Sequence, residues 1–215
     1  GNKKVLGKEI GAGKDGLRQL TDYLASNEYT IMHLSEKLCQ HFVSENPQKK
    51  DIDFIANSWR RGKGDLDQIH SAVIDRVINS KDDKFQWPIN WLFQVIRLSD
   101  ASYFHGWDSI YSEKEMMAVD DIFTELGQSF FSERQPNGYS NFKEDWLSGE
   151  MFERRLRFAS AIHKLGRVKN SPEQIMDRIG ANMTTRNLVK SAGQNSTDRF
   201  TALMCSPELM GLNSV

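Results

Sequence analysis

The sequence has few cysteines, almost no net charge and no long hydrophobic run, and each of these shortages excludes a class of protein. Its two cysteines, Cys39 and Cys205, are too few for a disulfide framework and are not spaced for a zinc site, although one long-range bridge between them stays open. A net charge of −1 gives no basic face of the kind that nucleic acid binding requires. No apolar run is long enough to cross a membrane, and no secretory signal is visible. We expect neither a nucleic acid partner nor a membrane span.

Motifs for catalysis and cofactor binding are also missing. No serine lies in an elbow motif and no HExxH is present. Residues 11–16 read GAGKDG but lack the Lys-Ser or Lys-Thr that completes a P-loop. His33 and His41 lie eight residues apart on a predicted helix, about 12 Å along its axis, which is too far to share one metal ion. We expect no cofactor and no metal.

Apolar residues at helical spacing are what the sequence does contain. Hydrophobic residues make up 39% of the chain and charged residues 27%, as in ordinary globular proteins. Spacing and capping residues predict ten helices, at residues 14–25, 30–44, 46–62, 65–77, 87–98, 112–126, 149–165, 171–180, 184–192 and 195–204. Residues 5–13 are predicted to be coil or a short extended arm. The fold class is all-α, an irregular multi-helix bundle of roughly ten helices with two long aromatic-rich loops. We expect one domain over residues 1–215, in which residues 166–215 could form a small helical appendage.

The longer of the two loops spans residues 126–146, which read LGQSFFSERQPNGYSNFKEDW. Pro136 followed by Asn137-Gly138 predicts a turn. Irregular loops of this length are functional or disordered, and the aromatic residues argue against disorder. Two interpretations stay open: the aromatic side chains staple the loop to the helices beneath it, or they form a binding surface. The candidate binding residues of this loop are Gln128, Asn137, Tyr139 and Trp146. The second aromatic loop covers residues 101–111.

Three charged residues are further binding candidates. Lys37 and His41 belong to a polar stripe beside the apolar face of one helix, and this stripe is either a solvated border or an anion-binding edge. Arg155 falls in line with Phe158 and Ile162, so it should be buried and should find a carboxylate or backbone carbonyls. Its role is to anchor the preceding loop or to recognise a carboxylate, sulfate or phosphate group.

A cluster of carboxylates precedes the longer loop. Asp120, Asp121 and Glu125 could supply the paired acids of a glycoside hydrolase. Acidic residues opposite the apolar face of a helix are usually solvated, and this is the interpretation that we adopt for them. No catalytic residue is therefore assigned.

Several stretches together resemble one family. Residues 29–47, YTIMHLSEKLCQHFVSENP, resemble a helix of the bacterial domain of unknown function 1800 family. The segments LGQSFF and QPNGYS, the following Trp146-Leu147, and Arg154 or Arg155 are similar to its next motif. LMCSPEL at residues 203–209 is similar to its closing segment. The sequence departs from the family at Trp87-Pro88, where a lysine usually precedes the proline, and it lacks the family's N-terminal half.

The resemblance implies a helical bacterial protein that is exported, as many members of the family are. It implies as partners the missing N-terminal half or a sulfatase-like protein, and it supplies no catalytic residue. Our leading hypothesis is a non-catalytic binding domain of an exported protein that contacts a partner protein or an envelope glycan through its aromatic loops. The alternative is a hydrolase acting on an envelope polymer or a sulfated or phosphorylated glycan, using Gln128, Tyr139, Arg155 and a nearby carboxylate.

Overall fold

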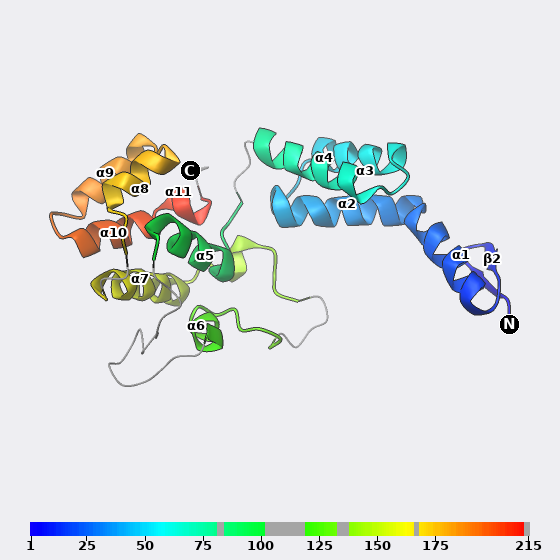
Figure 1. Ribbon diagram of the computed structural model, residues 1–215, viewed down its shortest axis with the longest axis horizontal. Coiled ribbons are helices and arrows are strands. Elements are labelled where there is room, and N and C mark those ends of the chain that lie inside the picture. The colour runs from blue at the N-terminus through cyan, green and yellow to red at the C-terminus, as the bar shows by residue number, and fades with distance from the viewer. Residues whose placement is uncertain (81–83, 102–118, 133–137, 166–167, 213–215) are drawn as a thin grey trace. The chain divides into compact units, whose positions relative to one another are not determined.

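The computed structural model describes residues 1–80, 84–101, 119–132, 138–165 and 168–212 (Figure 1). Within these ranges it contains eleven α-helices, one short 3₁₀ helix and one hairpin of two three-residue strands. The prediction of an all-α chain of roughly ten helices is confirmed. The chain divides into two compact units, Gly1–Asp82 and Asp83–Val215. The expectation of a single domain stays a prediction.

The first unit begins with the antiparallel strands β1 and β2, where we expected coil or an extended arm. Leu6 and Gly7 connect the strands, and both have the positive φ that a tight hairpin turn needs. Four helices follow. The bounds are β1 Lys3–Val5, β2 Lys8–Ile10, α1 Gly13–Ala25, α2 Glu28–Phe42, α3 Lys49–Arg61 and α4 Leu66–Asn79.

The core of the first unit is small and lies between α2, α3 and α4. It consists of Cys39, Ile55, Ile69, Ala72 and Val73. Because this core covers so few positions, Leu17 and Leu66 are both 62% exposed, although each belongs to a line of apolar residues at helical spacing. Gln48 is the N-cap of α3, so the helix starts at Lys49, inside the predicted range of 46–62.

The second unit contains the remaining helices. Their bounds are α5 Pro88–Ser99, α6 Val119–Glu125, the 3₁₀ helix η1 Lys143–Asp145, α7 Gly149–Lys164, α8 Pro172–Ile179, α9 Met183–Ser191, α10 Ser196–Met204 and α11 Pro207–Met210. No helix in the described parts of the chain is long and apolar enough to cross a membrane.

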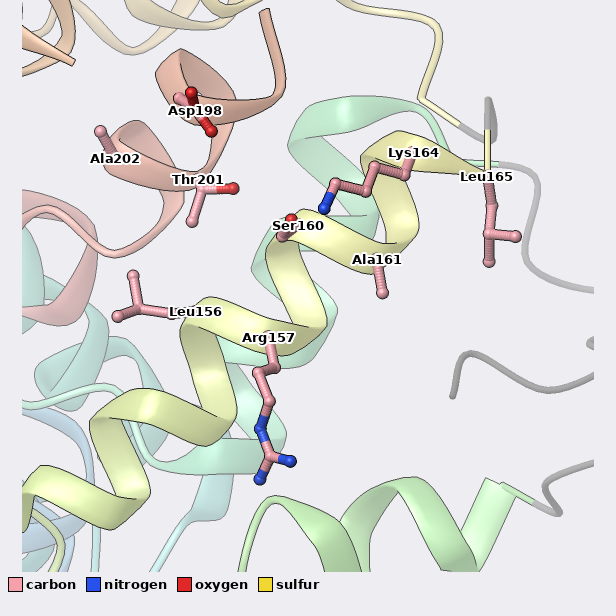
Figure 2. Close-up of a pocket in the computed structure, with 9 residues that line it drawn as sticks. All are labelled: Leu156, Arg157, Ser160, Ala161, Lys164, Leu165, Asp198, Thr201 and Ala202. Atoms are coloured by element: carbon pink, nitrogen blue, oxygen red, sulfur yellow. The ribbon is translucent and has the colours of Figure 1, made fainter. Parts of the chain in front are cut away.

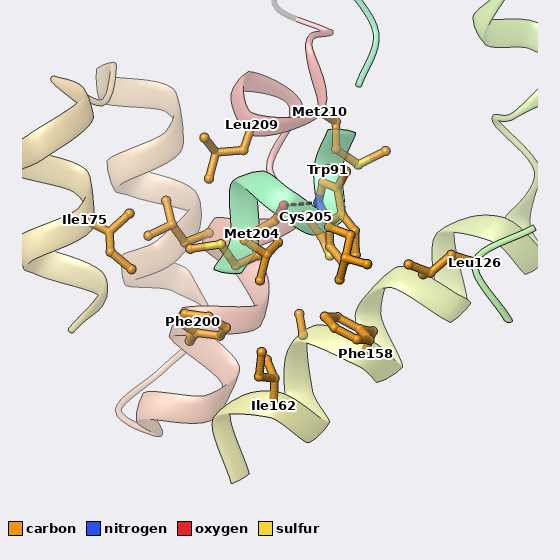
Figure 3. Close-up of a cluster of buried hydrophobic side chains, with 14 of the residues drawn as sticks. Trp91, Leu126, Phe158, Ile162, Ile175, Phe200, Met204, Cys205, Leu209 and Met210 are labelled. Carbon is orange, nitrogen blue, oxygen red and sulfur yellow. Dashed lines mark hydrogen bonds between the residues drawn. The ribbon is translucent and has the colours of Figure 1, made fainter. Parts of the chain in front are cut away.

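One hydrophobic core joins α5, α6 and α7 to the helices that follow residue 168 (Figure 3). Trp91 of α5 packs edge-on against Phe158 of α7, with ring centroids 5.9 Å apart. The indole Nε1–H of Trp91 donates to the carbonyl of Met204 in α10, at 2.8 Å. Phe200 and Ile175 are fully buried in the same cluster. Residues 168–212 therefore belong to this core.

Candidate functional site

Gln128, near the start of the longer loop, hydrogen-bonds to the first turn of α5 and does not present its side chain as a binding group. Gln128 is 9% exposed, and its Oε1 accepts the backbone N–H of Ile89 at 2.9 Å. Ile89 lies in the first turn of α5, where backbone N–H groups have no partner within the helix. The N-cap residue Trp87 makes no side-chain hydrogen bond to this turn. Gln128 supplies the missing acceptor from 39 residues further along the chain.

The tyrosine and tryptophan of the loop also turn their polar atoms toward the loop itself. The hydroxyl of Tyr139 donates to the carbonyl of Ser129 at 2.8 Å. The indole N–H of Trp146 donates to the carbonyl of Ser140 at 3.0 Å, and Trp146 is 6% exposed. The two rings lie 5.6 Å apart. These contacts favour the stapling interpretation for Tyr139 and Trp146.

Arg155 is the most deeply buried charged residue among the binding candidates, with 2% of its surface exposed. Its Nη2 donates to the carbonyl of Gln86 at 2.9 Å, and its guanidinium lies 5.0 Å from the ring of Phe85 and 5.3 Å from that of Trp91. Its Nη1 is buried and makes no hydrogen bond within the described residues. The expected burial and carbonyl contact are present, and the aromatic rings stand where we expected further carbonyls or a carboxylate.

Burial changes the acidity of Arg155 and of the nearby Cys205. Desolvation lowers the pKa of the Arg155 guanidinium from 12.5 to about 10, which corresponds to about 3 kcal/mol of unfavourable charge burial. Desolvation also raises the pKa of the Cys205 thiol to about 12, against a small opposing effect of the Arg155 charge. Cys39 and Cys205 are both free and buried, so neither forms the bridge that the sequence left open.

The other candidates belong to the first unit or lie outside the described residues. Lys37 and His41 are exposed on α2 of the first unit, where Lys37 Nζ donates to Gln40 at 3.3 Å and the His41 ring lies 4.5 Å from that of Phe42. Asn137 lies outside the described residues, as do residues 102–111 of the second aromatic loop.

The carboxylate cluster offers no described acid pair. Asp120 and Asp121 belong to α6, but their side chains are outside the described part of the structure. Glu125 uses its backbone carbonyl to accept from Nη1 of Arg154 at 2.8 Å. Among the side chains that the structure describes, no group of three or more His, Cys, Asp or Glu residues could hold a metal ion.

An exposed set of phenylalanines was missed by the sequence reasoning. Phe93 on α5 is 57% exposed, and Phe130 and Phe131 in the loop are 46% and 105% exposed. We call these three residues the phenylalanine surface. Phe123, 1% exposed, links the set to the core: its ring centroid lies 6.3 Å from that of Phe93 and 4.5 Å from that of Phe130. The pair Phe130-Phe131 was visible in the sequence, but nothing there indicated which aromatic residues point outward.

A pocket of about 740 Å³ lies along the outer side of α7 (Figure 2). Its described lining is largely apolar, with hydroxyls and charges at intervals, and α10 contributes part of one wall. The lining residues are Leu156, Arg157, Ser160, Ala161, Lys164, Leu165, Asp198, Thr201 and Ala202.

Comparison with known proteins gives one match. The model of a family described as "Protein of unknown function (DUF1800)" matches residues 1–208. No curated protein and no solved structure matches the chain. The family match extends from the first unit into α11 of the second, and it confirms the resemblance carried by residues 29–47, the longer loop and residues 203–208. The chain belongs to the DUF1800 family.

Proposed function

We propose that this chain is an interaction module that binds an apolar, acidic segment of a partner protein through the phenylalanine surface. The observation that carries the proposal is Phe131, whose ring is fully exposed and whose φ is +55°. A bulky residue at positive φ is uncommon and strained, typically by about 1–3 kcal/mol. An exposed aromatic ring gains no burial in the unbound chain, so the strain is not offset there. Burial against a partner would offset it.

The rigidity of the surface supports this role. The Phe130 ring packs edge-on against Phe123, which is itself part of the core of the second unit. The Phe93 side chain projects from α5, a helix whose first turn is completed by Gln128. Aromatic side chains held in place before binding lose little conformational freedom on binding, which is a property of residues that dominate interface energies.

The chemistry of the surface favours a protein over a glycan. Phenylalanine has no polar handle for sugar hydroxyls, whereas Tyr139 and Trp146 direct theirs into the loop. Arg97 is exposed on α5 one helical turn beyond Phe93, so it adds a positive charge beside the exposed rings. A segment with apolar side chains and a carboxylate complements both features. Export of the protein and a sulfatase-like partner belong to this proposal through the family resemblance alone.

The test is selection of a random peptide display library on the wild-type chain, followed by measurement of the dissociation constants of the enriched peptides. We expect peptides that combine apolar residues with Asp or Glu. Phe131→Asn should weaken their binding by about 10- to 100-fold, because a buried phenylalanine contributes about 1.5–3 kcal/mol. Asparagine tolerates positive φ, so this variant should melt no lower than the wild type.

Phe142→Ala is the matched control, since Phe142 lies in the same loop, is 45% exposed and is outside the phenylalanine surface. It should leave peptide binding unchanged. Enriched peptides that bind the Phe131→Asn variant as tightly as the wild type would refute the proposal. Glycan-array binding that survives Phe131→Asn would favour the glycan instead.

A further inference from the structure

A hydroxyl–imidazole pair lies in the second unit, apart from the phenylalanine surface. Nε2 of His163 in α7 lies 3.2 Å from Oγ of Ser196, the first residue of α10. Nδ1 of the same ring lies 3.0 Å from Oγ1 of Thr197. The two nitrogens of one imidazole thus each face a hydroxyl, and these hydroxyls come from consecutive residues. Ser196 is exposed and His163 is half-buried, so the pair can be reached from solvent.

We propose that Ser196 is a nucleophile, that His163 is its general base, and that the pair hydrolyses carboxylic esters with a small apolar acyl group. A serine hydroxyl is a weak nucleophile until an adjacent base removes its proton, and hydrogen-bond contact between the two is the geometric requirement. With the proton of His163 on Nδ1, that nitrogen donates to Thr197 and Nε2 is left to accept from Ser196. Thr197 is then a positioning residue, since its hydroxyl holds the imidazole ring at Nδ1.

The protonation state of the His163 imidazole suits a general base. Partial burial lowers its pKa below the ordinary value, because desolvation disfavours the charged imidazolium. The ring is therefore neutral near pH 7. Its 5.0 Å approach to the ring of Phe200, which is fully buried, holds it against the core.

The surroundings offer room for an acyl group. Lys164, which follows His163, and Asp198, which follows Thr197, line the pocket beside α7 (Figure 2). Ser160 and Thr201, one helical turn from His163 and Thr197 respectively, line it as well. The rest of the lining consists of the aliphatic or small side chains of Leu156, Ala161, Leu165 and Ala202, together with Arg157. Because residues adjacent to His163 in α7 and to Thr197 in α10 line this pocket, we assign the acyl group to it.

The first turn of α10 supplies donors for a developing oxyanion. Backbone N–H groups in the first turn of a helix have no partner within it, and they favour negative charge. Asn195 Oδ1 accepts the N–H of Thr197 at 2.8 Å. The N–H groups of Ser196 and Asp198 are therefore the first-turn donors nearest to the nucleophile.

The reaction proceeds in two steps. Ser196 Oγ bonds to the ester carbonyl carbon while its proton passes to His163 Nε2. The bond from that carbon to the alcohol oxygen then breaks, and the alcohol leaves with the proton from Nε2. Water attacks the acyl-serine by the same route, gives its proton to Nε2 and releases the carboxylic acid, which restores the Ser196 hydroxyl.

The test uses the full chain with a fluorophosphonate probe and with p-nitrophenyl butyrate. We expect the probe to label Ser196, as located by peptide mass spectrometry, and Ser196→Ala and His163→Gln to lower ester hydrolysis at least about a hundredfold. Ser191→Ala is the matched control: Ser191 is exposed, its Oγ bonds the carbonyl of Leu188, and its loss should change neither readout. Thr197→Val should slow hydrolysis and Thr197→Ser should restore it.

Because Ser196 is exposed, Ser196→Ala should have the melting temperature of the wild type. If it does, a loss of ester hydrolysis in this variant reports the loss of the hydroxyl and not unfolding. Absence of labelling at Ser196 in the folded wild-type chain would overturn the proposal, as would hydrolysis by Ser196→Ala at the wild-type rate. Either result would leave His163 as a structural link between α7 and the start of α10. Neither readout depends on the phenylalanine surface.

Discussion

The role of Gln128 can be tested by removing its acceptor while keeping its volume. We predict that Gln128→Leu destabilises the second unit, because the N–H of Ile89 loses its 2.9 Å bond and leucine offers nothing in its place. Loss of a helix cap costs about 0.5–2 kcal/mol, and leaving a buried donor unsatisfied costs about 1–3 kcal/mol. We therefore expect a loss of about 1–3 kcal/mol. For a unit of this size that lowers the melting temperature by roughly 3–10 °C.

The assay is urea unfolding followed by tryptophan fluorescence, since Trp87, Trp91 and Trp146 all lie in the second unit. The midpoint should fall while the slope stays unchanged, which is the signature of lost stability rather than of a changed unfolded state. Gln94→Leu is the matched control: Gln94 is on α5, and its buried Oε1 makes no hydrogen bond within the described residues. It should cost little. Equal midpoints for Gln128→Leu and Gln94→Leu would refute the capping role.

Three further outcomes can be measured in the same way. Tyr139→Phe should cost about 1 kcal/mol in urea unfolding, because it removes the bond to Ser129 while the ring keeps its place beside Trp146. Arg155→Ala should cost about 2–4 kcal/mol by leaving a cavity, whereas Arg155→Met should stay within about 1 kcal/mol of wild type in the same assay, because it fills the space and removes a buried charge. Stability should fall as pH rises above 9, because the pKa values of Cys39 and Cys205 are raised by burial to about 11 and about 12 in the folded chain, so that the unfolded chain binds fewer protons there. Thermal melts between pH 8 and pH 10.5 check this, and a flat profile would contradict it.

Local chemistry is what the sequence predicted best. The capping box of Ser171 and Gln174 is present at the start of α8, with both reciprocal bonds. Asp65 caps α4 by accepting from the N–H of Gln68. Such contacts join residues three positions apart, so the residue types suffice to predict them. The burial of Arg155 was predicted in the same way, from its place in an apolar line.

The direction of individual side chains was harder to predict, because it depends on packing between distant segments. Phe152 is 40% exposed although it lies on the same helix as the buried Phe158, while Trp146 and Phe131, both aromatic residues of one loop, have opposite environments. The bond from Gln128 to the start of α5 spans 39 residues, and no local pattern indicates it. The sequence thus predicted the helices, but not which residues of the longer loop face solvent.

The span of the contacts made by α5 has a consequence during synthesis on the ribosome. Trp91 donates to Met204, 113 residues later, and the N–H of Gln86 donates to the carbonyl of Met210. At about 5–20 residues per second, the partner of Trp91 is made roughly 6–23 s after Trp91 itself. The core contacts of the first unit, by contrast, close within residues 39–73. A nascent chain therefore carries an unfinished second core while these 113 residues are made, and this is the interval in which a chaperone would be needed.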